Sequence, residues 1–185
     1  DHAIEAVSKE SYGHTKKAFA LIFAAQFAQR SARPHKAKLQ LETAVEEARN
    51  TININSTDSY AFDALGGALR MRAELKRING EPISEIINES YSAFDSAISI
   101  NPKFPWALVD YAGTLLTEAQ DLISRGKDPT HAIKRSRDLC ERALLLDISY
   151  LNAYVTLSNG AVLQAQWSTE HGVSPLAVNA KRGPA

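Results

Sequence analysis

Apolar residues recur every three to four positions along most of the chain, the spacing that places them on one face of an α-helix. The segment from Phe104 to Arg125 shows this pattern at Leu108, Tyr111, Ala112, Leu115 and Ala119. Gly126 then supplies the residue type that commonly ends a helix in the left-handed conformation. Asp128 followed by Pro129 is typical of a helix start. We therefore expect a second helix from there to about Leu146.

The same pattern returns with a period of 46 residues. Three columns of identical residues keep this step: Ala61, Ala107 and Ala153; Ala73, Ala119 and Ala165; Gly80, Gly126 and Gly172. Internal repeats of this length are the signature of repeat architectures, in which each unit packs on its neighbours. Each unit is therefore expected to form one antiparallel pair of helices.

The repeats divide the chain into units of a single helical domain, residues 1–185. We assign residues 1–11 to the tail of a preceding helix, and the four units to 12–56, 57–102, 103–148 and 149–185. The first unit is less regular, with helices expected from Thr15 to Arg30 and from His35 to Asn50. The last is truncated, since its second helix opens at Pro175 and ends by Gly183. Because both ends look cut, we expect the segment to belong to a longer protein.

The second unit carries the clearest family pattern, with Phe62, Leu65, Gly66 and Leu69 in its first helix and Ser90, Phe94, Ala97 and Pro102 in its second. This spacing resembles the tetratricopeptide repeat, W-x2-L-G-x2-Y followed by A-x3-F and P. The fourth unit keeps Tyr154, Leu157 and Ser158, and the first keeps only Phe19, Ile22 and Phe23. The resemblance implies an all-α fold, an α-solenoid of about four antiparallel helix pairs in a right-handed superhelix. It also implies an interaction scaffold that binds a partner protein or peptide in its concave groove.

The length of the unit departs from the 34 residues of the family. A longer variant with a G-x-D-P turn is similar to arrays attached to bacterial serine/threonine protein kinases, and Gly126-Lys127-Asp128-Pro129 matches that turn. This suggests a bacterial, cytoplasmic protein and, as an alternative function, a regulatory or substrate-docking domain of such a kinase. The chain itself carries no kinase signature: it has no Gly-rich phosphate loop, no H-R-D and no D-F-G.

Charge and composition narrow the classes of partner. Lys and Arg number 21, as do Asp and Glu, so the net charge of zero gives no general attraction to nucleic acid or anionic membranes. A basic cluster from Arg70 to Arg77, with Arg125 and Lys127 in the next unit, leaves an RNA-binding array as a second alternative. The apolar run from Ala18 to Ala28 imitates a signal peptide but is too short to span a bilayer. We expect no membrane partner. We do expect self-association of the chain through the apolar helix flanks at its two ends.

Residues that could support chemistry are scattered. The five histidines form neither i, i+4 pairs nor a cluster with cysteine, so we expect no metal and no cofactor. Cys140 occupies an apolar helix position, which predicts a buried, inert thiol. Glu46 and Glu47 lie on a polar helix face and are predicted to be solvated. We therefore predict no catalytic residues and no enzyme activity.

The first helix of each unit should line the concave face of a solenoid. A stripe beside the apolar core stripe continues from unit to unit at the step of 46. The predicted groove residues are Tyr60, Asp63, Gly67, Met71, Glu74, Trp106, Asp110, Gly113, Thr117, Gln120, Asn152, Asn159 and Gln166. Aromatic residues beside polar ones are typical of binding patches, and the glycines would let a ligand backbone approach closely. The alternative, a solvated helix face with Val109 and Val155 packing between units, stays open.

Overall fold

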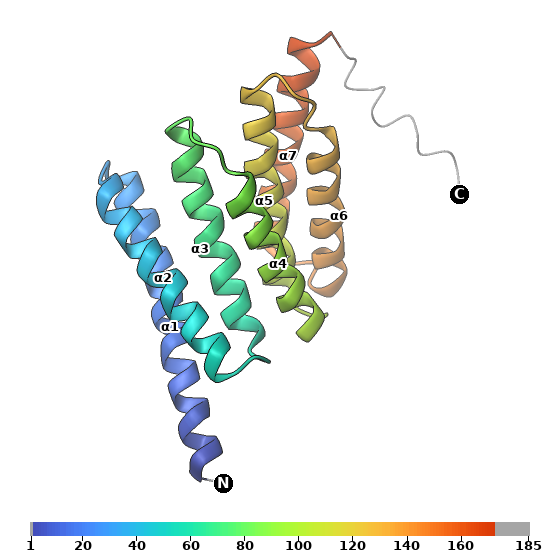
Figure 1. Ribbon diagram of the computed structural model, residues 1–185. Helices are drawn as coiled ribbons and strands as arrows, with labels where there is room; N and C mark the ends of the chain where they lie inside the picture. Colours follow the sequence, from blue (N-terminus) through green and yellow to red (C-terminus); the bar gives the residue numbers. More distant parts are fainter. Residues whose placement is uncertain (1, 173–185) are drawn as a thin grey trace.

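The computed structural model describes residues 2–172, and side chains from residue 11 onward (Figure 1). This part of the chain folds into seven helices, with no strand among the described residues. They are α1 (His2–Arg30), α2 (Pro34–Ile54), α3 (Ser59–Ile78), α4 (Ser84–Ile100), α5 (Pro105–Ser124), α6 (Thr130–Leu146) and α7 (Leu151–Glu170). The predicted all-α class is confirmed, and so is the arrangement as a solenoid of helix pairs.

The glycines at the ends of α3 and α5 adopt the conformation that the repeat predicted. Gly80 and Gly126 have φ angles of 74° and 65°, a region in which residues with a Cβ atom are strained. The Lys127 N–H donates to the Leu122 carbonyl at 2.8 Å and thereby satisfies one of the last carbonyls of α5. Both α3 and α5 therefore end in a turn that reverses the chain into the antiparallel partner helix.

The start of α6 differs from the prediction by one residue. The helix begins at Thr130, and the Asp128 carboxylate accepts a hydrogen bond from the Thr130 N–H at 2.9 Å. A hydrogen bond from the Thr130 side chain is the main cause of the lowered pKa of Asp128, and this backbone hydrogen bond lowers it further. The N-cap residue is therefore Pro129 and not Asp128 as predicted, although Asp128 still accepts a hydrogen bond from the first residue of the helix.

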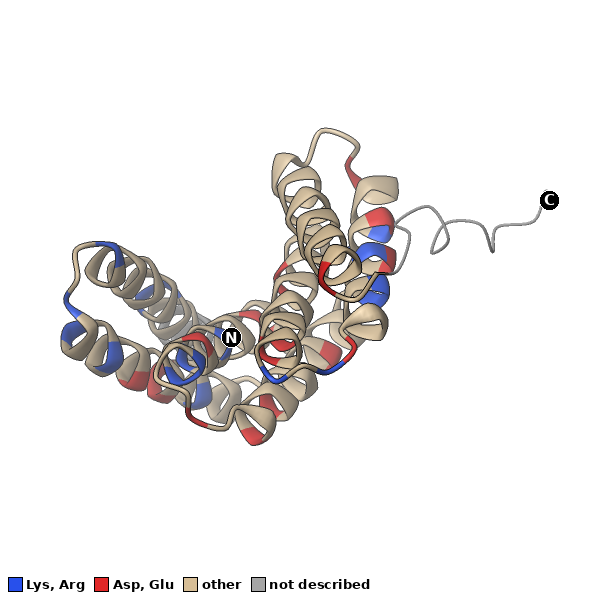
Figure 2. Cartoon of the chain, turned by 90° about the horizontal axis from the view of Figure 1, so that it is seen from above, with Lys and Arg blue, Asp and Glu red and all other residues tan. Residues whose placement is uncertain are grey.

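The helices form two layers. The odd-numbered helices α1, α3, α5 and α7 each contact the next odd-numbered one, whereas α2, α4 and α6 contact only odd-numbered helices within the described chain. Because helices of the first layer lie closer together, the array must bend with that layer on the inside. Figure 2 shows this bend as an arc of helices that is open on one side. The first helices of the units therefore line the concave side, as predicted.

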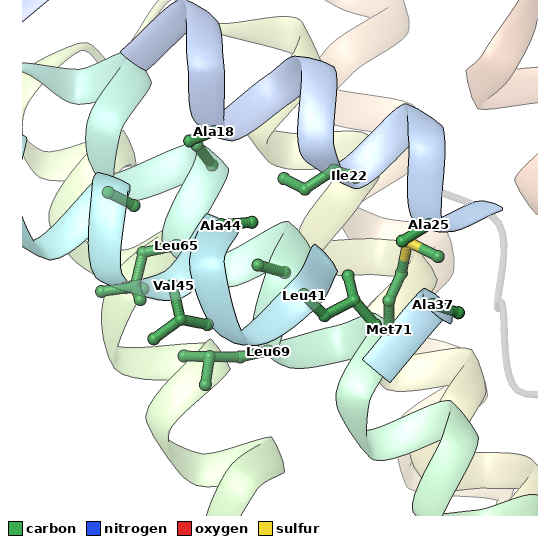
Figure 3. Close-up of a cluster of buried hydrophobic side chains, with 14 of the residues drawn as sticks. Ala18, Ile22, Ala25, Ala37, Leu41, Ala44, Val45, Leu65, Leu69 and Met71 are labelled. Carbon is green, nitrogen blue, oxygen red and sulfur yellow. The ribbon is translucent and has the colours of Figure 1, made fainter. Parts of the chain in front are cut away.

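The core lies between the two layers. Leu41 and Val45 of α2 pack beside Leu65 and Leu69 of α3 in one buried cluster (Figure 3). Burying a leucine or valine side chain contributes roughly 1.5–3 kcal/mol, so this contact joins the first helix pair firmly to the second.

Between α3 and α4, Gly66 lets the two helices approach closely. A Cβ atom at Gly66 would lie only 2.7 Å from the ring of Phe94. The Ser90 hydroxyl donates to the Gly66 carbonyl at 2.9 Å across the same contact. The glycine and serine of the repeat pattern therefore serve helix packing.

The N-terminal unit departs from the prediction. Residues 2–30 form one continuous helix instead of a tail that ends before a separate helix from Thr15. The Ser11 and Thr15 hydroxyls donate to the Asp58 carboxylate, which caps α3, so this part of α1 packs on its own array. No proline interrupts the segment, and Gly13 alone does not break a helix. The second helix likewise extends beyond the predicted Asn50, to Ile54.

Two further expectations concern the ends of the array. Ile22 is buried, but Phe23 is 65% exposed, so only part of the apolar pattern of the first unit packs into the core. The helix predicted from Pro175 lies outside the described residues. The unit boundaries and the right-handed sense of the superhelix stay predictions.

Candidate peptide-binding groove

A groove of about 600 Å³ lies on the inner side of the array, between α3, α5 and α7. Seven of the predicted groove residues line it: Glu74, Asp110, Gly113, Thr117, Gln120, Asn152 and Asn159. They come from all three of these helices and include charged, amide, hydroxyl and very small side chains. The step of 46 residues thus brings these positions together on one surface.

Seven further residues line the groove without having been predicted: Arg70, Val109, Leu116, Val155, Thr156, Val162 and Leu163. Val109 and Val155 follow Asp63 at the step of 46, so the repeat itself could have indicated them. They belong to the repeating columns of the stripe, and the alternative interpretation assigned them to packing between units. Arg70 was assigned to a basic helix end, and nothing in the sequence showed that its side chain turns toward α5.

Three predicted residues are buried instead of being open to the groove. Asp63 is only 2% exposed, and Gly67 and Met71 are also buried. A Cβ atom at Gly67 would lie 3.9 Å from Ile22, because α1 packs along this side of α3. Gly67 therefore makes a helix contact and does not offer its backbone to a ligand. Met71 belongs to the core between α1, α2 and α3, and it borders a second hollow on the inner side.

The remaining three predicted residues lie outside the lining of the groove. Tyr60 and Trp106 are 45% and 52% exposed at the starts of α3 and α5. Their rings lie 6.4 Å apart between centroids in a T-shaped arrangement, with the buried Phe104 ring 4.7 Å from Tyr60. Gln166 is exposed near the end of α7, where its amide donates to Glu170 at 3.1 Å. The aromatic pair therefore lies at one end of the stripe and Gln166 at the other.

Arg70 crosses from α3 toward α5 above Gly113. A Cβ atom at Gly113 would meet Arg70 Cδ at 3.8 Å and Nε at 3.9 Å. The Arg70 Nε atom is buried and has no hydrogen-bond partner. The small residue in α5 therefore makes room for the arginine, which lines both the groove and the neighbouring hollow against α1.

Two carboxyl groups beside this arginine have raised pKa values. Burial is the main cause for both Asp63 and Asp110, and the charge of Asp110 raises the pKa of Asp63 further. Arg70 opposes the shift at both groups, yet no ion pair within the described chain joins it to either carboxylate. Asp110, which lines this end of the groove, and the buried Asp63 are therefore two acids without an ion-pair partner in the described chain.

Three of the six cations of the predicted basic edge, Lys76, Arg77 and Arg125, are paired with carboxylates. Arg77 donates to both carboxylate oxygens of Glu74, at 2.7 and 3.0 Å. Lys76 pairs with Glu81 at 3.0 Å, and Arg125 pairs with Asp121 at 2.8 Å. Cations that already neutralise carboxylates attract phosphate weakly.

The structure corrects the prediction that Glu46 and Glu47 are both solvated. Glu46 is exposed, but Glu47 is 7% exposed and lies between α1 and α2. Its carboxylate accepts from Lys17 Nζ at 2.6 Å and contacts His14 Nδ1 at 2.5 Å. The hydrogen bond from Lys17 is the main cause of the lowered pKa of Glu47.

Other candidate chemistry is sparse in the described part of the chain. Cys140 is fully buried, and burial raises the pKa of its thiol to about 12, which confirms the prediction of an inert thiol. No three His, Cys, Asp or Glu residues lie together as a metal site would require, among the residues that the structure covers. No described helix is long and apolar enough to cross a membrane.

Comparisons with known proteins point to the fold. No family profile matches the sequence, and no curated protein matches it either. Among solved structures, the first TPR domain of the human RPAP3 protein is similar with a TM-score of 0.53 at 10% identity, over 84% of this chain and 98% of that one. A mutant O-GlcNAc transferase from Thermobaculum terrenum matches with a TM-score of 0.48 at 16% identity, over 85% of this chain and 26% of that one. The similarity to the RPAP3 domain shows that this chain has a TPR-like fold of stacked helix pairs.

Proposed function

We propose that this chain is a non-enzymatic interaction scaffold that binds an extended segment of a partner protein in the groove between α3, α5 and α7. The observation that carries the proposal is the open groove of about 600 Å³ on the inner side. Its size lies within the range of ligand pockets, roughly 300–1,000 Å³. The TPR-like fold supports the same general role.

The lining suits a peptide backbone. Asn152 and Asn159 lie two helical turns apart on α7, and both line the groove. Each amide side chain can donate and accept hydrogen bonds, as a peptide backbone also does. Seven residues of helix rise by roughly 10 Å, about the length of three residues of extended chain. Val155 lies between the two amides, where it offers an apolar contact to a side chain of the bound segment.

The other functions have less support. The kinase association rests on the turn from Gly126 to Pro129, which here connects α5 to α6 as any loop of suitable length would. The RNA-binding alternative rests on six cations, of which three are already paired with carboxylates. A bacterial origin and a cytoplasmic location stay predictions from the resemblance.

The first test fills the groove with a side chain. In Gly113→Leu, the new side chain starts in ordinary contact with the flexible Arg70, so the helix should tolerate it and gain up to about 1 kcal/mol of helix propensity. Gly13→Leu is the matched control, since it places the same residue on α1 where no atom lies within 4 Å of the added Cβ. A random dodecapeptide display library would be selected on the wild-type chain, and the affinity of an enriched peptide measured for all three proteins.

We expect Gly113→Leu to weaken binding of the enriched peptide by about tenfold or more, because the groove is occupied. Gly13→Leu should bind as the wild type does. Equal binding by Gly113→Leu, with its fold intact by circular dichroism, would place the peptide elsewhere and overturn the proposal. Failure of the wild type to enrich any peptide would also overturn it.

A further inference from the structure

Asp63 is buried without the partner that a buried carboxyl group needs. It lies on the same stripe of α3 as Arg70 and Glu74, both of which line the groove. The side chain is 2% exposed, and its Oδ1 atom has no hydrogen-bond partner. An unsatisfied buried polar atom destabilises a fold by about 1–3 kcal/mol, and by more if it is charged. A ligand that supplies a donor would remove this penalty.

A second acid faces the first across the two helices. Asp110 of α5 lines the groove and lies close enough for its charge to act on Asp63. Arg70 is the cation that acts on both, but it forms no ion pair with either, and its Nε atom lacks a partner too. The cluster thus contains two carboxyl groups and a single, poorly placed positive charge. An additional cation would be attracted here, whereas an anion would be repelled.

Aromatic residues lie one helical turn before each of these acids, and a third lies near both. Tyr60 precedes Asp63 by one helical turn, and Trp106 precedes Asp110 by one turn. Both rings are about half exposed. Tyr150, at the start of α7, lies near enough to both acids that their charges, after burial as the main cause, help to raise its pKa to about 12. Cations bind favourably over the faces of such rings, and the alkyl stem of a lysine or arginine packs well on them.

We infer that Tyr60, Asp63, Trp106, Asp110 and Tyr150 form a pocket for a lysine or arginine side chain of the bound segment. The inference rests on the proposed function and specifies the chemistry of the partner. The stem of the basic side chain lies along the exposed rings, and its head group donates to the Asp110 carboxylate at the end of the groove. The rest of the segment continues past Gly113 toward Asn152 and Asn159.

Proton release follows from this arrangement. Burial raises the pKa of both Asp63 and Asp110, and the charge of Asp110 raises the pKa of Asp63 further, so both hold a proton more tightly than a solvated aspartate does. A bound cation favours the ionised carboxylate, so binding expels that proton. The affinity for a basic peptide should therefore rise with pH. Arg70 and Tyr150 are the other charged or titratable groups near the two carboxyl groups, and burial raises the pKa of Tyr150 to about 12, so this phenol stays neutral in the range tested.

The test uses the enriched dodecapeptides on the full chain. Asp110→Asn removes the accessible charge without changing size, and Asp138→Asn makes the same change on an exposed site of the outer helix α6 as a matched control. The library would be selected on all three proteins. We expect a fixed lysine or arginine position with the wild type and with Asp138→Asn, and none with Asp110→Asn.

A double-mutant cycle makes the test specific. One peptide with lysine at the fixed position is compared with the same peptide carrying norleucine there, which keeps the stem and removes the charge. Norleucine should weaken binding to the wild type by about tenfold and leave binding to Asp110→Asn nearly unchanged. Affinity of the lysine peptide for the wild type should rise from about pH 5 to about pH 8, and the rise should vanish in Asp110→Asn.

The outcomes separate this inference from the proposed function. Peptides that are lost with Gly113→Leu but show no basic position would overturn the pocket and leave the groove standing. Enrichment of acidic residues that depends on Arg70, tested with Arg70→Ala, would also overturn the pocket, since it would make the arginine the recognition group. Binding that is insensitive to Gly113→Leu would instead overturn the proposed function.

Discussion

Two buried acidic sites in this molecule have opposite electrostatics. Glu47, between α1 and α2, has an ion pair with Lys17 at one carboxylate oxygen and a contact with His14 at the other, and its pKa is lowered. Asp63, between α3 and α5, has an oxygen without a partner, and its pKa is raised well above the ordinary value. Both side chains are more than nine-tenths buried. Burial alone therefore does not reveal what an acid contributes.

The difference lies in where the compensating charge comes from. The partners of Glu47 belong to the same helix pair, so the site is complete within the fold and ties α1 to α2. The acids Asp63 and Asp110 have no such partner in the described chain, and Asp110 borders an open groove. The first site therefore stabilises the array, whereas the second is the site that we propose a ligand completes.

We expect the largest change in the free energy of unfolding when Glu47, the acid with partners in the fold, is replaced. Glu47→Ala should lower the free energy of unfolding by about 2 kcal/mol, because it removes a buried acceptor and leaves Lys17 and His14 without it. Urea unfolding followed by circular dichroism would measure the change. The neighbouring exposed Glu46→Ala is the matched control and should stay within about 0.5 kcal/mol of the wild type. Equal losses in both variants would contradict a structural role for the Glu47 ion pairs.

We expect a smaller change in the free energy of unfolding, of opposite sign, when Asp63 is replaced. Asp63→Asn should raise the free energy of unfolding by up to about 1 kcal/mol near neutral pH, because a neutral amide is buried more easily than a carboxylate and does not repel Asp110. The exposed Asp138→Asn should leave stability unchanged. If Asp63→Asn instead destabilised the chain as much as Glu47→Ala does, the carboxyl group would be holding the fold together and the contrast between the two sites would fail.

The regular part of the fold was predictable because its signals are local and periodic. Gly126 and Asp128 set the ends of α5 and α6 through backbone conformation and capping, which depend on a few neighbouring residues. Ala61, Ala107 and Ala153 are all fully buried, as expected for a repeated contact between helices. The step of 46 residues also identified half of the groove lining.

Depth below the surface was not predictable from the same pattern. Periodicity assigns a residue to a face of a helix, but the approach of the neighbouring helix decides whether that face is open. Asp63 and Asp110 both belonged to the predicted stripe, yet Asp63 is buried and only Asp110 borders the groove. Glu47 was misjudged for the same reason, since its partners Lys17 and His14 lie about thirty residues earlier in the chain.

The pH dependence of these variants is the finest test of the contrast. The lowered pKa of Glu47 gives stability that is present above the ordinary value of 4.5 and is lost as the pH falls through the folded-state value. The deficit of Glu47→Ala should therefore shrink below about pH 4.5. The raised pKa of Asp63 works in the opposite direction, because the folded state holds a proton that the unfolded state has released above the ordinary value of 3.8.

The wild type should consequently lose stability at the Asp63 site as the pH rises, and the gain from Asp63→Asn should grow with it. Urea midpoints of both variants and the wild type, measured from about pH 4 to about pH 8, would show the two trends. A gain from Asp63→Asn that is independent of pH would mean that the carboxyl group ionises as easily in the folded chain as in the unfolded one. The acid would then have a partner already, and the pocket at the end of the groove would not need a basic side chain to complete it.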